Sequence, residues 1–141
     1  MLRQFIGSVI VQAPAQGLHP VGREVGQWLS AQPITDGLLT LLCRHTSASL
    51  LIQENAAPAA RRDLEAYFAR VAPESTDYEH DDEGPDDMPA HVRSALTQTS
   101  LSIPVSRGRL TLGMWQGIYL FEHRRQPPAR EIALHLIGEP G

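Results

Sequence analysis

The side chains best suited to chemistry in this sequence are histidines at the ends of ordered segments. The chain has six histidines, and four of them occupy such places: His45, His80, His91 and His123. His45 ends an apolar segment, His80 lies in an acidic stretch, and His91 falls in the first turn of a predicted helix. Three converging imidazoles with an open coordination position form a catalytic type of divalent metal site. Because their spacing matches no metal motif, ordinary surface histidines remain the alternative.

A second candidate is the polar segment CRHTSAS at 43–49, which joins two apolar segments. The guanidinium of Arg44 and the hydroxyls of Thr46 and Ser47 are groups that can bind a phosphate. A serine nucleophile is disfavoured because the sequence has no G-x-S-x-G motif and no evident Ser–His–Asp order. The alternative is a turn in which the Thr and Ser side chains satisfy their own backbone.

Two further groups stand at the junctions of predicted elements. Glu54 is a candidate general base or ligand, because the helix N-terminus that follows it attracts anions. Asn55 beside it is a candidate N-cap. Trp115 and Gln116 lie between two glycines in GMWQG, and glycine in a strand lets a ligand or another backbone approach closely. Trp115 therefore either stacks on a flat heterocycle or packs in the core.

Residues 73–87, PESTDYEHDDEGPDD, are acidic and almost free of core residues. They lack the alternating oxygen ligands and the final glutamate of an EF-hand calcium loop. We interpret them as a solvated loop. Long polar loops often carry function, so His80 in the middle of this one is placed to swing over a ligand.

The composition limits the classes of function. With 141 residues the chain is long enough for one domain, 1–141, with its own core. A net charge of -4 disfavours general nucleic-acid binding. The absence of lysine excludes lysine Schiff-base and P-loop chemistry. No apolar run reaches the length of a membrane span, and the N-terminal segment is typical of a first strand rather than a secretion signal. The single Cys43 rules out an internal disulfide and fits a cytoplasmic location.

The elements that must position these residues follow from periodicity. Strands are predicted at 4–12, 38–43, 48–53, 101–105, 109–123 and 130–138, and helices at 21–32, at 55–71, and from an Asp86 or Asp87 cap to 96. The helix at 55–71 is expected to bury Leu64, Phe68 and Val71. The continuous apolar run at 38–43 favours a strand covered on both faces. This order indicates an α+β domain with mainly antiparallel sheets in a sandwich-like core and about three helices packed against it.

Four segments in order resemble the YjbQ family of small bacterial and archaeal proteins: RHTSASLLIQEN, YEHDDEGPDDMPAH, SLSIPVSRGRLTLGMWQGIYLFEHR and REIALHLIGE. The resemblance runs from about Leu38 to Glu139. It implies an α+β subunit that assembles as a homotrimer, with a histidine-rich site near subunit contacts. The family's site residues then fall on His45, Glu54, Asn55, His80, His91, Trp115 and Gln116. Many relatives read EFDGPR where this chain has Glu122 and His123 followed by two arginines, so His123 is not counted as a ligand.

The resemblance also implies thiamine-phosphate synthase activity, as a main or a secondary activity. This reaction joins hydroxymethylpyrimidine diphosphate to thiazole phosphate and releases pyrophosphate. Such a reaction needs a divalent ion, zinc or magnesium, or arginines on the leaving diphosphate, and a site closed to water. The residues implied for these roles are His45, His80 and His91 for the metal, Arg44 with Arg107 or Arg109 for phosphate, Trp115 for stacking, and Glu54 and His80 for catalysis. The alternatives are a metal-dependent hydrolase of a small phosphate or ester with Glu54 as base, and a non-catalytic trimer that binds a metal or an anionic metabolite.

Overall fold

A computed structural model describes residues 1–75 and 77–141 of the chain. The elements in chain order are β1 (Arg3–Val11), β2 (Gly17–Pro20), α1 (Gly22–Ser30), β3 (Asp36–Cys43), β4 (Ala48–Glu54), α2 (Pro58–Val71), α3 (Asp87–Leu96), β5 (Ser100–Ser106), β6 (Arg109–Leu110), β7 (Gln116–Glu122) and β8 (Arg130–Glu139). Residue 76, within the acidic segment 73–87, lies outside the described residues.

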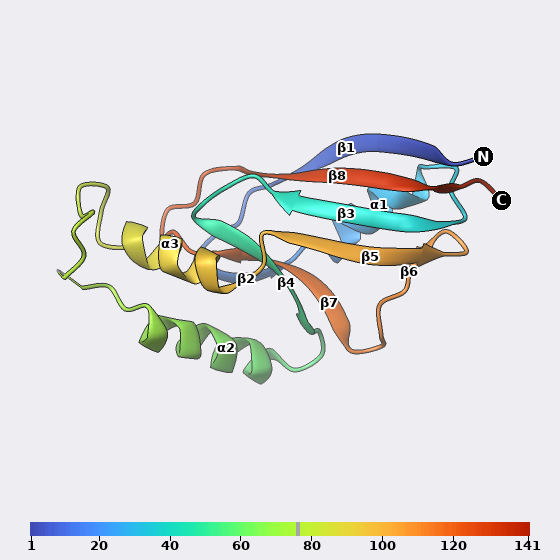
Figure 1. Cartoon of the computed structure of the whole chain (residues 1–141). Helices are drawn as coiled ribbons and strands as arrows, with labels where there is room; N and C mark the ends of the chain where they lie inside the picture. The colour runs from blue at the N-terminus through green and yellow to red at the C-terminus, as the bar shows by residue number, and fades with distance from the viewer. Residues whose placement is uncertain (76) are drawn as a thin grey trace.

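Two antiparallel sheets form the framework (Figure 1). The larger has the strand order β1-β8-β3-β5-β6, and the smaller has the order β2-β7-β4. Alternate side chains of both sheets point into one shared core, to which α1 adds Val25 and Leu29. Among the core residues are Leu39, Leu41, Leu50, Ile118, Leu120, Ile132, Leu134 and Leu136. The predicted α+β sandwich-like core is therefore confirmed.

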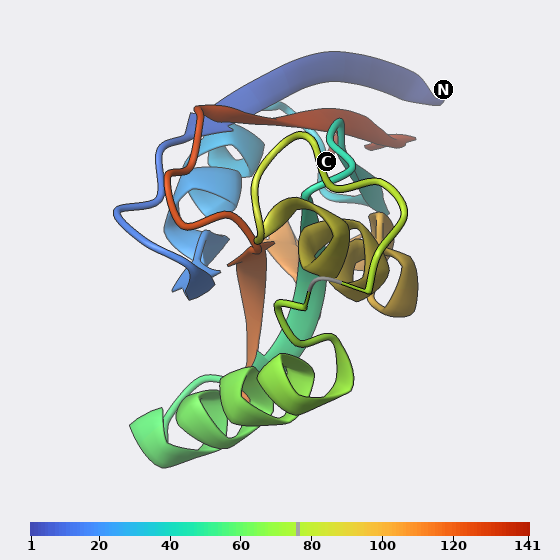
Figure 2. The same cartoon turned by 90° about the vertical axis from the view of Figure 1, so that its left-hand side faces the viewer.

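The helix α2 covers the other face of the small sheet, as Figure 2 shows. Leu64 and Phe68 of this helix pack against Tyr119 and Phe121 of β7. Val71 was expected in the same stripe, but 44% of it is exposed because it stands in the last turn, beyond the edge of the packed cluster. Pro58 occupies the first helical position, where its missing N–H costs no hydrogen bond.

Two details of the predicted elements were wrong. The single strand expected over 109–123 is broken between β6 and β7, because the Gln116 side chain accepts a hydrogen bond from the Gly113 N–H and folds 113–116 into a turn. Asp86 precedes α3 but makes no side-chain cap. Its carboxylate instead accepts hydrogen bonds from Arg124 Nε at 3.0 Å and from the Arg125 N–H at 2.9 Å.

The outer face of the large sheet carries no helix in the described chain (Figure 1). Ile6 and Ile10 of β1 and Leu38 and Leu42 of β3 point outward and are exposed by 81%, 61%, 39% and 42%. The apolar run of β3 is thus covered on one face only within the described chain, not on both faces as its composition predicts.

A polar network is buried between the two sheets. Glu122 of β7 and Arg130 of β8 are almost fully buried and form two charge-assisted hydrogen bonds, of 2.7 and 2.6 Å. His123 is 0% exposed, and its Nε2 lies 2.9 Å from Ser49 Oγ. The Thr97 hydroxyl lies 2.5 Å from the same Ser49 oxygen and 2.8 Å from the Arg93 carbonyl.

The hydroxyls of Ser49 and Thr97 link His123 to the backbone of α3. Thr97 has two acceptors within reach, Ser49 Oγ and the Arg93 carbonyl, and Ser49 shares a hydrogen bond with His123 Nε2. The other ring nitrogen, Nδ1, is buried and has no partner among the described residues. Burial, with Arg93 and Arg130 nearby, lowers the pKa of His123 to about 3. His123 is therefore a neutral core residue.

No helix in residues 1–75 and 77–141 has both the length and the apolar composition of a membrane span. The two ends of the chain lie side by side, because β1 and β8 are neighbours and Arg3 pairs with Gly138 (Figure 1).

Candidate functional site

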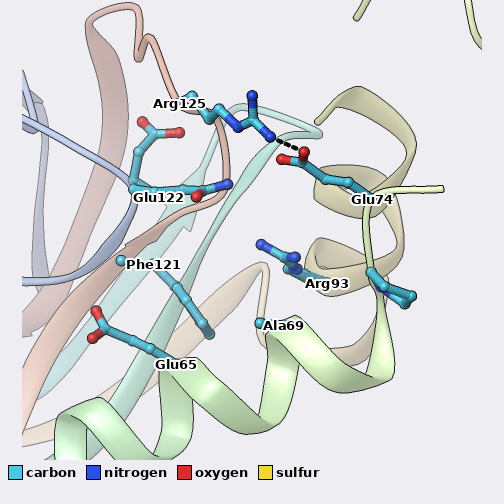
Figure 3. Close-up of a pocket in the computed structure, with 10 residues that line it drawn as sticks. Glu65, Ala69, Glu74, Arg93, Phe121, Glu122 and Arg125 are labelled. Carbon is cyan, nitrogen blue, oxygen red and sulfur yellow. Dashed lines mark hydrogen bonds and ion pairs between the residues drawn. The ribbon is translucent and has the colours of Figure 1, made fainter. Parts of the chain in front are cut away.

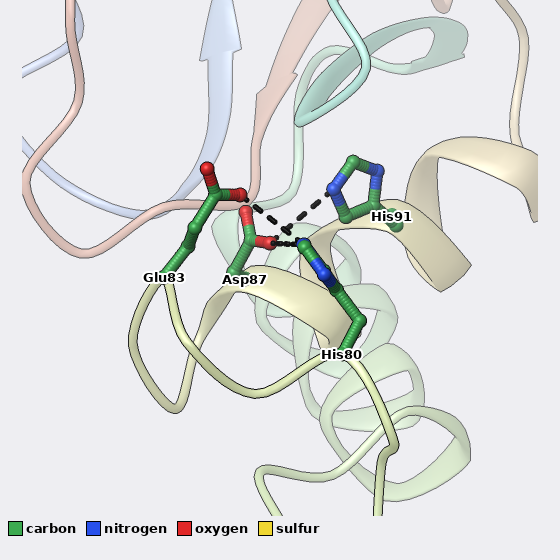
Figure 4. Close-up of side chains that lie close together, drawn as sticks. All are labelled: His80, Glu83, Asp87 and His91. Atoms are coloured by element: carbon green, nitrogen blue, oxygen red, sulfur yellow. Dashed lines mark hydrogen bonds and ion pairs between the residues drawn. The ribbon is translucent and has the colours of Figure 1, made fainter.

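Four side chains that can bind a metal converge where the acidic loop meets α3 (Figure 4). They are His80, Glu83, Asp87 and His91, and one ligand atom from each lies within 4.8 Å of the others. Asp87 and His91 are four residues apart in α3, so they share one face of the helix. The loop then folds back and brings His80 and Glu83 over that face.

Asp87 is at the centre of this cluster, and its carboxylate is 4% exposed. Its Oδ2 lies 3.2 Å from His80 Nε2 and 3.3 Å from His91 Nε2. Neither contact has hydrogen-bond geometry, so this buried oxygen has no hydrogen-bond donor among the described residues. An anionic oxygen buried in this way and facing two imidazoles is in the position of a metal ligand.

Arg124 holds the loop and the helix together. Its guanidinium donates to Asp87 Oδ1 at 2.7 Å, to Asp86 Oδ2 at 3.0 Å and to the Glu83 carbonyl at 3.0 Å. These bonds occupy one Asp87 oxygen and leave the other directed at the histidines. Arg124 therefore positions Asp87 in the way that an outer-shell partner orients a ligand.

His80 was predicted both as a metal ligand and as a catalytic group. Its Nε2 faces Glu83 at 3.2 Å and Asp87 at 3.2 Å, and its Nδ1 lies 3.4 Å from Asp82. The hydrogen bond to Glu83 raises the pKa of His80, with Asp82 and Asp87 adding to the effect. Because Nε2 cannot bind a metal and carry a proton together, the geometry favours ligation over acid–base work.

His45 lies beside this cluster but is not one of the four converging residues. It lines a shallow hollow of about 280 Å³ together with Thr46 and His91. Its Nε2 accepts a 2.8 Å hydrogen bond from the Glu131 N–H, so Nδ1 is the ring nitrogen that remains as a candidate metal ligand. Burial, followed by the nearby Arg130, lowers the pKa of His45 and favours the neutral imidazole that metals bind.

The other residues of CRHTSAS take different roles. The exposed Arg44 pairs with Glu131 at 2.6 Å, a surface ion pair that a stronger anion can replace. Thr46 lies at the hollow beside His45. The Ser47 carbonyl accepts a hydrogen bond from Arg130 Nη2 at 3.1 Å, so its backbone belongs to the buried network.

Glu54, Asn55, Trp115 and Gln116 come together elsewhere, at the other end of β4 and β7. Strand β4 has seven residues, so its two ends are separated by about 20 Å. His45 precedes that strand, whereas Glu54 ends it. The fold therefore separates the predicted site residues into two groups.

Glu54 holds the segment before α2, whereas Asn55 and Gln116 hold the turn that precedes β7. Glu54 Oε2 accepts hydrogen bonds from the N–H groups of Ala57 and Ala56 at 2.7 and 2.8 Å, which lower the Glu54 pKa. The Asn55 side chain donates to the carbonyls of Met114 and Gln116 at 3.3 and 3.4 Å.

The outcome of these contacts is a braced turn that displays Met114 and Trp115 to solvent, with 80% and 61% of their surface exposed. The sequence left Trp115 open between stacking and the core, and the structure places it outside the core.

Sequence reasoning missed Glu83, Asp87 and Arg124. The spacing of Asp87 and His91, an i, i+4 pair of ligand types on a predicted helix, was a usable signal. Glu83 and Arg124 offered none, because one is part of an acidic run and the other comes from a distant loop.

Comparisons of the sequence and of the fold with known proteins point to the same protein family. The family model described as UPF0047 protein YjbQ-like matches residues 8–139. A UPF0047 protein of Synechocystis sp. is 46% identical over 97% of this chain and 94% of its own. The UPF0047 protein YjbQ of Escherichia coli O157:H7 is 45% identical over 94% of this chain and 96% of its own. A solved structure from Thermus thermophilus, a conserved hypothetical protein, has a TM-score of 0.80 at 33% identity over 91% of this chain and 97% of its own.

Proposed function

Because the chain belongs to the YjbQ-like family UPF0047, we propose that it is a metal-assisted transferase that acts on small phosphorylated heterocycles. The observation that carries the proposal is the convergence of His80, Glu83, Asp87 and His91 around the orphaned Asp87 Oδ2. Two imidazoles with carboxylates suit zinc better than magnesium, which prefers oxygen ligands and water. His45, across the hollow from its neighbour His91, is a further candidate ligand through Nδ1.

The reaction we propose is the formation of thiamine phosphate from hydroxymethylpyrimidine diphosphate and thiazole phosphate, as a main or a secondary activity. A divalent ion in the cluster would neutralise negative charge on the leaving diphosphate. Arg44 can exchange its Glu131 partner for a phosphate oxygen, because its guanidinium is exposed and binds phosphate bidentately. Thr46, in the hollow beside His45, supplies a hydroxyl to the same phosphate.

We further propose that the protein assembles as a homotrimer and that each complete site draws on two subunits. The two groups of site residues lie at opposite ends of β4, and Trp115 and Met114 are displayed rather than packed. The uncovered apolar residues of β1 and β3 offer additional surface for contact between copies. In a head-to-tail ring, the Trp115 turn of one subunit would cover the His45–His91 hollow of the next and keep water out.

A cytoplasmic location completes the proposal. Its support is Cys43, the one cysteine of the sequence, which is buried as a free thiol.

The first experiment separates metal binding from the reaction. Asp87→Asn and His91→Ala are purified beside the wild type and a control, His19→Ala, and their metal content is measured by inductively coupled plasma mass spectrometry. We expect zinc in the wild type and the control and its loss in both cluster variants. Thiamine phosphate is then assayed with the two proposed substrates. Metal loss together with retained activity would refute the metal mechanism. Metal binding without activity on these substrates would leave a metal-dependent hydrolase or a non-catalytic binding trimer as the better account.

The second experiment tests the shared site. Under the proposal, trimers made only of His91→Ala subunits or only of Trp115→Ala subunits are inactive. When equal amounts of the two are dissociated and reassembled together, about a quarter of the interfaces combine a wild-type His91 with a wild-type Trp115. We expect about that fraction of activity to return. No recovery, in a mixture shown by mass spectrometry to contain hybrid trimers, would overturn the shared site. Light scattering on the wild type tests the trimer itself.

A further inference from the structure

One cavity of the described chain lies away from the histidine cluster, on the other side of α3. It has a volume of about 440 Å³, within the range of small-ligand sites, and is bordered by α2, α3 and β7 (Figure 3). Arg93 stands two residues after His91, which places it about 200° around the helix axis from the metal-facing side. The cavity is therefore separate from the site already described.

Arg93 is an unusual residue for a cavity wall because it is only 8% exposed. Its Nη2 donates to the Ala72 carbonyl at the end of α2 at 2.8 Å, and its Nε is buried with no partner among the described residues. No carboxylate of the described chain lies within ion-pair distance of this guanidinium. Burial lowers the pKa of Arg93, and the more distant Tyr78 and Asp86 oppose this effect only in part.

The carboxylates that share the cavity wall are already occupied. Glu122 is paired with Arg130, and Glu74 is paired with Arg125. Glu65 accepts the Leu18 N–H at 2.8 Å. Arg93 is thus the one lining cation of the described residues without a carboxylate partner, and its hydrogen bond goes to the neutral Ala72 carbonyl.

We propose that this cavity binds a small monocarboxylate with a compact apolar body, held by Arg93. Figure 3 shows the guanidinium of Arg93 directed into the space between Glu74 and Phe121, so the carboxylate would meet its terminal nitrogens. The Phe121 ring and Ala69 supply the apolar wall for the rest of the ligand. A single negative charge matches the single unmatched cation, whereas a phosphate dianion would face repulsion from Glu65, Glu74 and Glu122.

The experiment uses benzoate as the probe, with benzamide as its neutral isostere and inorganic phosphate as the dianion. Binding to the full chain is measured by calorimetry, and the site is located by amide chemical shifts in two-dimensional NMR. We expect saturable benzoate binding, with shifts at Ala69 and Phe121 and none at His45 or Trp115. Binding of benzamide as strong as that of benzoate, or of phosphate stronger than it, would overturn the proposed ligand class. Failure of benzoate to bind would overturn the site.

Two variants test the residues that carry the proposal. Arg93→Gln should weaken benzoate at least tenfold, which is about 1.4 kcal/mol. Because this change also removes the bond to the Ala72 carbonyl, its fold is checked by circular dichroism. Ala69→Trp places a bulky ring in the cavity from α2 while keeping Arg93 in the sequence, and it should abolish binding. Arg70→Gln, which removes the neighbouring exposed guanidinium of α2, should leave binding unchanged. Wild-type affinity in either cavity variant contradicts the assignment, whatever the effect of that change on stability.

Discussion

The buried His123 makes the stability of the protein depend on pH in a way that can be calculated. Its pKa is about 3 in the folded chain, against a usual value of 6.5. Between these values the unfolded chain binds a proton at this residue and the folded chain does not. The free energy of unfolding therefore decreases as pH falls, by up to about 1.4 kcal/mol per pH unit. The contribution is fully present above pH 6.5 and is lost as the pH falls toward 3.

From pH 6 to pH 4 this single group should remove about 2.5 kcal/mol of stability, since the folded-state pKa lies below that range. The assay is urea unfolding at a series of pH values and one fixed protein concentration, for the wild type and for His123→Gln. The glutamine amide can still donate to Ser49 but cannot gain a proton. All other titrating groups are common to both proteins, so the difference between the two curves isolates His123.

We expect the wild type to lose stability faster than His123→Gln on acidification and the two curves to run parallel above pH 7. A control, His19→Gln, changes an imidazole on the surface of β2 and should follow the wild-type slope. Parallel curves for the wild type and His123→Gln from pH 6 to pH 4 would falsify the reasoning, because they would mean that the folded chain protonates His123 at little cost.

Three other perturbations follow from the same structure. Glu122→Gln leaves Arg130 buried without a counter-ion and should lower the free energy of unfolding, measured by urea titration, by about 3 to 5 kcal/mol. The double variant Glu122→Leu with Arg130→Met removes both charges and should lower it by less than that single change. Gly37→Ala should lower the melting temperature by several degrees, because its new Cβ would overlap the Ile137 carbonyl of the paired strand β8, while Gly26→Ala, in open space on α1, should not. Burial raises the pKa of the Cys43 thiol, so iodoacetamide should leave it unmodified in the folded protein and alkylate it in urea, as mass spectrometry can follow; rapid alkylation without urea would contradict its burial.

The main elements could be predicted from the sequence because their periodicity reflects burial. Strand β1 alternates, and its inward residues do pack on the core. Strand β2 was missed because Gly17–Pro20 is short and carries glycine and proline, so only its pairing with β7 makes it a strand. Tertiary contacts decide such segments, and they leave no local pattern.

The candidate site was predicted in part for a similar reason. His80 and His91 do converge, but the carboxylates between them were indistinguishable in an acidic run. Only the fold buries Asp87 while leaving Glu83 exposed. Glu54 was a candidate general base or ligand, and its carboxylate accepts backbone N–H groups ahead of α2. Asn55 was a candidate N-cap, but the N-cap of α2 is Ala57, and the Asn55 side chain donates to the turn before β7. Hydrogen bonds between a side chain and the backbone of a distant segment depend on the tertiary fold, so the residue type alone does not predict them.

The neighbouring ends of the chain allow its connectivity to be rearranged. Because Arg3 pairs with Gly138, a short glycine linker can join the two ends without disturbing β1 or β8. New ends can then be opened between Asp81 and Asp82, both exposed. In such a circular permutant the strands of both sheets stay intact, but His80 and Glu83 lie near opposite ends of the new chain. The permutant therefore tests whether the four-residue cluster needs an unbroken loop backbone or only the hydrogen bonds of Arg124.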